Sequence, residues 1–196
     1  MVDRKSNMQR NLRDLYQIKI SLKDVKPPVW RRLLLSSSTD LAELHRIIQI
    51  AMGWSDSYLH QFTADHQQFG VPDTEFGNSI NPERGKRIGS LLKHENQWMT
   101  YEYDCGDGWE HIVTLEKILP YQPAEAGPNC IDGRGGAPPE DVGGAWDYQE
   151  FLEAYTDQGH PDHQEKVDWV GDQFDPDHFD IADINSKLKK IPKTFV

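Results

Sequence analysis

The residues that could do chemistry gather in two segments of this 196-residue chain. The first, YDCGDGWEH over residues 103–111, places carboxylates, an indole and an imidazole around a Gly-Asp-Gly turn. The second, CIDGRGGAPPEDVGG over residues 130–144, carries adjacent carboxylates after two prolines that stiffen the backbone. Carboxylates and imidazoles together can bind a divalent metal ion or share a proton in general acid–base catalysis. Both segments are therefore candidates for a functional site.

The turn inside the first segment decides which side chains share a face of the predicted hairpin. A two-residue turn within residues 106–108 places a carboxylate, an imidazole and an indole on one face. That face would carry Glu102, Asp104, Trp109 and His111, and the opposite face Tyr101, Tyr103, Glu110 and Ile112. The structural alternative is that Asp104 and Asp107 stabilise the turn while His111 bonds a cross-strand neighbour. An odd-length loop would break the predicted sharing of faces.

We predict a binding cleft between the hairpin of residues 101–116 and the loop of residues 130–144. Aromatic side chains of the hairpin would supply its apolar surface, and an arginine with two carboxylates of the loop would fix its polarity. The candidate residues are His60, Tyr101, Asp104, Asp107, Trp109, His111, Arg134, Glu140 and Asp141. A divalent metal is the one cofactor suggested by these residue types, and its expected ligands are Asp104, His111, Glu140 and Asp141. The alternative is that the loop carboxylates only lie near a helix N-terminus.

The remaining histidines and cysteines give weaker signals. His60 is predicted to point inward from a strand, and His45 is predicted at the boundary of a helix, outside its apolar stripe. Cys105 and Cys130 lack a CxxC partner, so a zinc site would need both to meet in space with a histidine. Two cysteines are too few for a disulfide scaffold and indicate a reducing compartment, so we expect a cytoplasmic protein.

The elements that must position these residues are readable from periodicity. Alternation of apolar and polar residues predicts a strand over 16–23, and VWRRLLL predicts a second, antiparallel strand over 29–35. A helix follows, with Asp40 and Glu43 as its capping box and Gly53 as its end. The further predicted strands cover residues 58–64, 97–105 and 109–116, whereas residues 70–90 are predicted as a long connection and residues 120–146 as turns without regular structure.

The last third of the chain is predicted to be helical. A helix framed by Asp147 and Glu150 is followed by one that runs from Pro161 to Gly171, and Asp180 caps a final helix. Strands followed by helices, without regular alternation, favour an α+β fold: an antiparallel sheet with a packed central helix and a helical C-terminal third. We predict one compact domain over residues 16–190, after a polar leader of residues 1–15 and before a tail of residues 191–196.

The charge of the chain limits its partners. The net charge is −11, and residues 101–185 alone carry 21 acidic side chains and three basic ones. This segment would repel phosphates, so nucleic acid is not the partner expected there. No apolar run approaches the roughly 20 residues of a membrane span, and no signal peptide is recognised. An unknown small molecule or a protein is therefore the partner we expect.

Five blocks of the sequence together resemble the plasmid pRiA4b ORF-3-like family. They are PPVWRR, LAELHRIIQIAMGWSDSYLHQF, YDCGDGWEHIVTLE, CIDGRGGAPPEDVGG and FDPDHFDIADIN, in the expected order over about residues 16–190. The resemblance implies a compact α+β domain and no particular reaction. Resolvase or repressor labels carried by some members find no support here, because Ser21 lacks an arginine-rich setting and no helix-turn-helix is predicted. The family often has phenylalanine at Cys105 and cysteines at Ala137 and Val142, which argues against a general cysteine metal site.

Three functions remain open at this point. The first is ligand or partner binding at the predicted cleft. The second is a metal-dependent hydrolase or nuclease that uses the Asp/His/Glu cluster. The third is a structural or regulatory interaction module associated with mobile elements. Convergence of Asp104, His111 and Glu140 or Asp141 on one point would favour the second.

Overall fold

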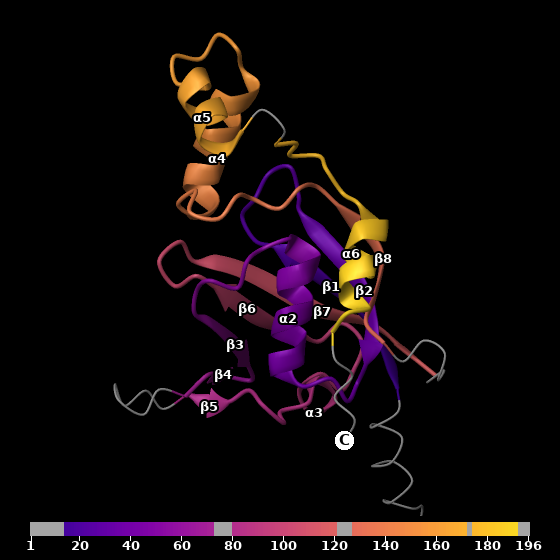
Figure 1. Cartoon of the computed structure of the whole chain (residues 1–196). Helices are drawn as coiled ribbons and strands as arrows, with labels where there is room; N and C mark the ends of the chain where they lie inside the picture. The colour runs from indigo at the N-terminus through magenta and orange to yellow at the C-terminus, as the bar shows by residue number, and fades with distance from the viewer. Residues whose placement is uncertain (1–13, 73–79, 121–126, 172–173, 192–196) are drawn as a thin grey trace, which may run out of the picture.

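One mostly antiparallel sheet with helices packed against it forms the protein. A computed structural model describes residues 14–72, 80–120, 127–171 and 174–191 (Figure 1). The predicted leader and tail therefore lie outside the described residues, except for residues 14, 15 and 191. Within the described ranges, eight strands form a single sheet in the order β5-β4-β3-β6-β7-β1-β2-β8. The predicted α+β fold is confirmed.

The strands and helices alternate irregularly along the chain. The strands are β1 (Leu15–Leu22), β2 (Trp30–Ser36), β3 (His60–Ala64), β4 (Gln67–Gly70), β5 (Asn81–Pro82), β6 (Trp98–Tyr103), β7 (Trp109–Leu119) and β8 (Asn129–Arg134). The helices are α2 (Leu41–Met52), α3 (Ile88–Leu91), α4 (Gly144–Thr156), α5 (His163–Val170) and α6 (Ile181–Leu188). Only β4 and β5 pair in parallel among these strands.

Helix α2 covers one face of the sheet (Figure 1). The Asp40 carboxylate accepts a hydrogen bond of 2.8 Å from the backbone N–H of Glu43, and Gly53 ends the helix in the left-handed conformation. Leu44, Ile47 and Ile48 are fully buried in the same hydrophobic core as the inward residues of β1 and β2. The predicted helix, its N-cap Asp40 and its end at Gly53 are confirmed, and the two strands lie within one residue of their predicted bounds.

Three parts of the chain differ from the sequence predictions. Residues 129–134 form strand β8 on the edge of the sheet beside β2, although their Gly- and Pro-rich surroundings predicted no regular structure. Within 70–90, the short strand β5 and helix α3 interrupt the predicted connection, and residues 73–79 lie outside the described residues. Helix α4 begins at Gly144 behind a left-handed Gly143, so Asp147 lies in its first turn and is not the N-cap.

The C-terminal helices occupy two places. Helices α4 and α5 pack on each other at one end of the molecule, and α6 lies beside α2 next to β2 and β8 (Figure 1). Asp180 caps α6 as predicted, because its carboxylate accepts from the N–H groups of Ala182 and Asp183. None of the described helices has the length and the apolar character that a membrane span requires.

Candidate functional site

The turn of the hairpin is longer than predicted, and this exchanges its faces. Tyr103 pairs with Trp109 and Tyr101 pairs with His111, so five residues, 104–108, form the loop. These four side chains share one face and are almost fully buried. The predicted grouping of Glu102 and Asp104 with Trp109 and His111 is wrong, because an odd loop moves one strand by a residue relative to the other.

The loop carboxylates hold the turn and the neighbouring loop. Asp104 has a φ of +57° and accepts from the N–H of Gly106 at 3.0 Å. Asp107 accepts at 3.0 Å from the N–H of Gly143. A Cβ on Gly144 would lie 2.3 Å from the carbonyl oxygen of Asp107, so the two backbones are in direct contact.

Residues 138–141 also lie directly against the segment 54–60, which connects α2 to β3. Glu140 accepts a hydrogen bond of 2.7 Å from the Tyr103 hydroxyl and one of 3.1 Å from the N–H of Ser55. Asp141 accepts a short hydrogen bond from the Tyr58 hydroxyl, which raises the pKa of Tyr58 to about 12. The Trp54 indole donates to the carbonyl of Pro138 at 2.9 Å. Direct contacts therefore join this loop to the rest of the domain on the side where we predicted a cleft.

The predicted site residues separate into four groups, of which His60, beside His45 and Asp56, is one. Asp104, Asp107, Glu140 and Asp141 belong to the contact between loop and hairpin. Arg134 is exposed at the end of β8. Tyr101, Trp109 and His111 lie in the core. Within the described residues, the four expected metal ligands do not converge as one ligand set.

His111 is the most enclosed of these groups. Its Nδ1 lies 3.0 Å from the carbonyl oxygen of Trp109, and its Nε2 is the one buried side-chain nitrogen or oxygen without a hydrogen-bond partner in the described part of the chain. Desolvation lowers the pKa of His111 to about 4, so the side chain is neutral at physiological pH. This residue is a core histidine.

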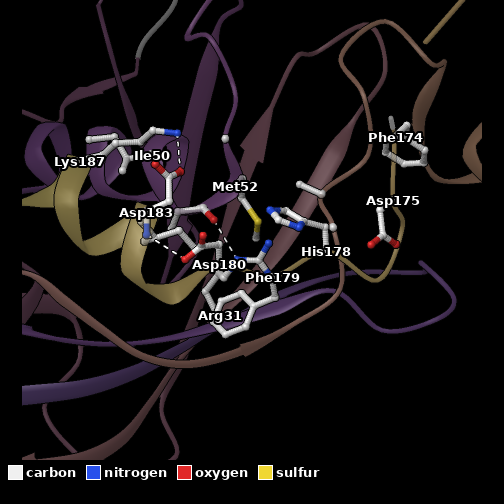
Figure 2. Close-up of a pocket in the computed structure, with 15 residues that line it drawn as sticks. Arg31, Ile50, Met52, Phe174, Asp175, His178, Phe179, Asp180, Asp183 and Lys187 are labelled. Atoms are coloured by element: carbon white, nitrogen blue, oxygen red, sulfur yellow. Dashed lines mark hydrogen bonds and ion pairs between the residues drawn. The ribbon is translucent and has the colours of Figure 1, made fainter. Parts of the chain in front are cut away.

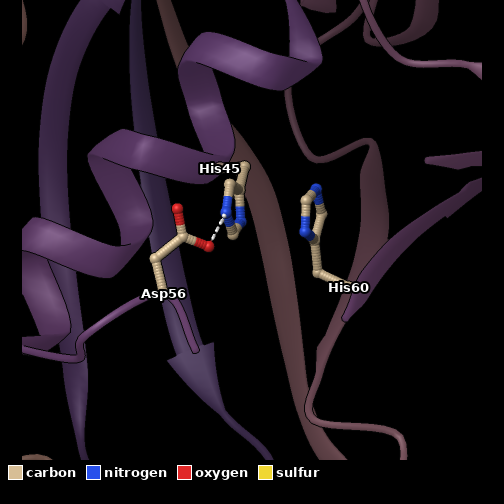
Figure 3. Close-up of side chains that lie close together, drawn as sticks. All are labelled: His45, Asp56 and His60. Atoms are coloured by element: carbon tan, nitrogen blue, oxygen red, sulfur yellow. Dashed lines mark hydrogen bonds and ion pairs between the residues drawn. The ribbon is translucent and has the colours of Figure 1, made fainter. Parts of the chain in front are cut away.

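A different cluster brings metal-ligating atoms together. His45 on α2, Asp56 after α2 and His60 at the start of β3 present ligand atoms within 4.8 Å of one another (Figure 3). The two imidazoles are stacked, with ring centroids 3.5 Å apart and an angle of 5° between the planes. His45 Nε2 lies 2.7 Å from Asp56 Oδ1, and His60 Nε2 lies 2.7 Å from Glu83 Oε2. Two histidines and two carboxylates thus form one cluster.

Buried polar groups fix the orientation of His45. Its Nδ1 lies 2.8 Å from the hydroxyl oxygen of Tyr101, which also accepts at 3.0 Å from the amide of Gln49. The other end of the Gln49 amide accepts from the N–H of Asp56 at 3.1 Å. One glutamine therefore ties together the tyrosine that orients His45 and the backbone that carries Asp56.

The cluster sets two carboxylates against two imidazoles. Burial and the neighbouring His60 lower the pKa of His45, against the opposing effect of Asp56. Two imidazolium rings stacked at 3.5 Å would also repel each other. In the part of the chain that the structure describes, neither Asp56 nor Glu83 forms an ion pair with a lysine or arginine. A divalent cation would balance the two carboxylates.

Sequence reasoning identified His60 but missed the cluster. His45 was predicted at a helix boundary, yet only 5% of it is exposed, because Tyr101 and Asp56 supply hydrogen bonds inside the fold. Fourteen residues separate His45 from His60, and Glu83 follows a further connection, so no local metal motif exists. The available signal was the inward position of His60 on β3.

Comparisons with known proteins give consistent results. The family model described as plasmid pRiA4b ORF-3-like protein matches residues 14–183. The uncharacterized protein y4hQ of Sinorhizobium fredii (strain NBRC 101917 / NGR234) is 39% identical over 148 residues, which are 75% of this chain and 76% of that protein. A crystal structure of the protein of unknown function MM3350 from Methanosarcina mazei Go1 superposes with a TM-score of 0.79 and 33% identity, over 88% of this chain and 98% of that one.

Proposed function

This chain belongs to the plasmid pRiA4b ORF-3-like family. We propose that it is a metal-binding protein that holds one divalent ion through His45, Asp56 and His60. The observation that carries the proposal is the convergence of these three side chains from two elements and a loop. Glu83 supports the site from beside His60.

Each imidazole has one nitrogen available for the ion while the other keeps its hydrogen bond. If His45 binds through Nε2, its Nδ1–H donates to Tyr101, as the second partner of a metal-bound histidine usually does. Nδ1 of His60 has no hydrogen bond to the described residues, so it is free to bind while Nε2–H donates to Glu83. A carboxylate behind a ligating histidine increases the basicity of that ligand.

The two imidazoles must turn relative to each other before both can bind one ion, because their planes are nearly parallel, with centroids 3.5 Å apart, and the lone pairs lie in those planes. A tetrahedral site with bonds of about 2.1 Å has ligand atoms about 3.4 Å apart, so the pair His45–Asp56 would widen from 2.7 Å, and the three residues already offer ligand atoms within 4.8 Å of one another. Asp56 is the ligand that can adjust, because half of its side chain is exposed. Two histidines and one carboxylate leave a coordination position for a further ligand, as in catalytic metal sites. Zn²⁺, Fe²⁺ and Co²⁺ suit this ligand set better than Ca²⁺ or Mg²⁺.

Metal titration tests the proposal directly. The full-length protein, stripped with a chelator, should bind one equivalent of Zn²⁺ in calorimetry. With Co²⁺ it should develop visible absorption bands of a four- or five-coordinate site with nitrogen and oxygen ligands. Absence of stoichiometric binding of both ions would overturn the proposal and leave the cluster as a hydrogen-bonded network.

Variants locate the site. Asp56→Asn keeps the shape of the side chain and tolerates the φ of +59°, so the fold should persist while affinity falls by about 100-fold or more. Tyr101→Phe keeps the three ligands but removes the hydroxyl that bonds His45 and Gln49, and it should weaken binding by about 10- to 100-fold. The matched control is Asp65→Asn, because Asp65 is exposed and also left-handed, with a φ of +48°. Equal loss of binding in the control would show that the ion binds elsewhere.

A further inference from the structure

A second feature lies at the C-terminal end of α2, on the side of α6, and none of the metal-cluster residues lines it. A cavity of about 390 Å³ opens between the C-terminal end of α2, residues 136–137 and residues 174–187 (Figure 2). Its size falls within the range of small-molecule sites. Apolar side chains from all three segments line it: Ile50, Met52, Ala137, Phe174, Phe179 and Ile184.

Arg31 of β2 forms part of the cavity wall, and only 3% of this residue is exposed. Its Nε donates to the carbonyl of Ala51, and its Nη1 donates to the carbonyls of Trp30 and Arg134. Desolvation lowers the pKa of Arg31 to about 10, which leaves the guanidinium charged at neutral pH. A buried positive charge held only by neutral carbonyls is unusual, because burial of a charge normally requires a counter-charge.

One edge of the guanidinium remains free. Nη2 makes no hydrogen bond to the described residues. It is nevertheless not one of the fully buried polar atoms that lack a partner, so part of its surface is accessible. It therefore reaches the cavity. The Phe179 ring lies over the guanidinium, with its centroid 5.0 Å from Cζ, and holds this edge in place.

The carboxylates around the cavity are already occupied. Asp183 pairs with Lys187 at 2.6 Å, Asp180 caps α6, and Asp175 accepts from the N–H of Asp177. No carboxylate of the described residues pairs with Arg31. Their negative charge at the mouth disfavours a dianion such as phosphate, whereas a single carboxylate meets less repulsion.

We propose that this cavity binds a small apolar monocarboxylate, with its carboxylate on Nη2 of Arg31 and its hydrocarbon part against the apolar lining. The guanidinium gives a carboxylate a charge-assisted donor in a site with little water. The aliphatic and aromatic walls select an acid that has an apolar body. This site is independent of the metal cluster, so either proposal can fail alone.

Nuclear magnetic resonance of the full-length chain tests the proposal through the Arg31 side chain. In ¹⁵N-labelled protein, sodium benzoate should shift the Nε–H signal of Arg31 saturably, because that proton is buried and hydrogen-bonded. Benzamide, which has the same shape without the charge, and inorganic phosphate should bind far more weakly. Equal binding of benzamide, tighter binding of phosphate, or no shift with benzoate would each overturn the proposal.

Three variants separate recognition from folding. Arg31→Met should weaken benzoate binding by about 30-fold or more, the effect of removing one partner of a buried charge pair. Because that change also removes structural hydrogen bonds, Ala137→Phe provides a second test: it fills the cavity and keeps Arg31, and it should also abolish binding. Arg46→Met on the exposed side of α2 is the control and should bind as the parent does. Unchanged binding in Ala137→Phe would place the ligand elsewhere.

Discussion

The buried His111 makes the stability of this protein sensitive to mild acid. The unfolded chain takes up a proton at this side chain near its ordinary pKa of 6.5, whereas desolvation holds the pKa in the folded chain at about 4. Protonation therefore favours the unfolded state between these values. The stabilisation is fully present above pH 6.5 and is lost progressively as the pH falls towards 4.

The size of the effect follows from the two pKa values. Between pH 7.5 and pH 4.5, the linkage relation gives a loss of about 2.5 kcal/mol in the free energy of unfolding from this group alone. Burial of the whole ring and the missing partner of Nε2 are the structural causes, because neither solvent nor a carboxylate is present to stabilise the imidazolium. Such a loss is a large fraction of the stability of a typical domain.

Urea unfolding of chelator-treated protein, followed by tryptophan fluorescence, measures the effect. His111→Phe removes the titration while keeping a ring of similar size, so its free energy of unfolding should fall less between pH 7.5 and 4.5 than that of the parent. The difference between the two pH dependences isolates His111 from all other titrating groups. His94→Phe, at an exposed histidine, should retain the pH dependence of the parent. Identical acid losses in His111→Phe and the parent would refute the reasoning.

Other parts of the fold give sharper single-site predictions. Gly53→Ala should cost about 1 kcal/mol, because its φ of +81° is strained for alanine but the space is open. Gly144→Ala should cost clearly more, since its Cβ would also meet the backbone of Asp107; urea unfolding compares the two. Asp40→Ala should lose about 1–2 kcal/mol by the same assay through loss of the helix cap. The hydrogen bond and the charge of Arg32 lower the pKa of Glu116, so ionised Glu116 stabilises the fold above the ordinary pKa of 4.5, and this stabilisation is lost as the pH falls below that value. In Glu116→Gln, the free energy of unfolding should therefore depend less on pH in this acidic range.

Local rules account for the parts of the fold that the sequence predicted correctly. Alternation in β1 and the pair Asp40–Gly53 around α2 each act within a few residues, so they are visible in the chain itself. Strand β8 is different, because its partner β2 lies about 100 residues earlier and supplies the hydrogen bonds that its Gly-rich sequence does not suggest. The five-residue hairpin loop was missed because a Gly-Asp-Gly turn suits several loop lengths.

The candidate metal site shows the same limit at the level of side chains. His45 and His60 become a pair only because α2 crosses the sheet over β3 and β6, where Tyr101 can orient one ring and Glu83 the other. The segment 54–60 then joins this site to the loop of residues 138–141, since neighbouring residues contact the two sides: Ser55 bonds Glu140, and Asp56 bonds His45. The acidic loop of residues 138–141, which stands out in the sequence, thus bonds the two residues before Asp56. These contacts help to fix the position of Asp56, the proposed metal ligand.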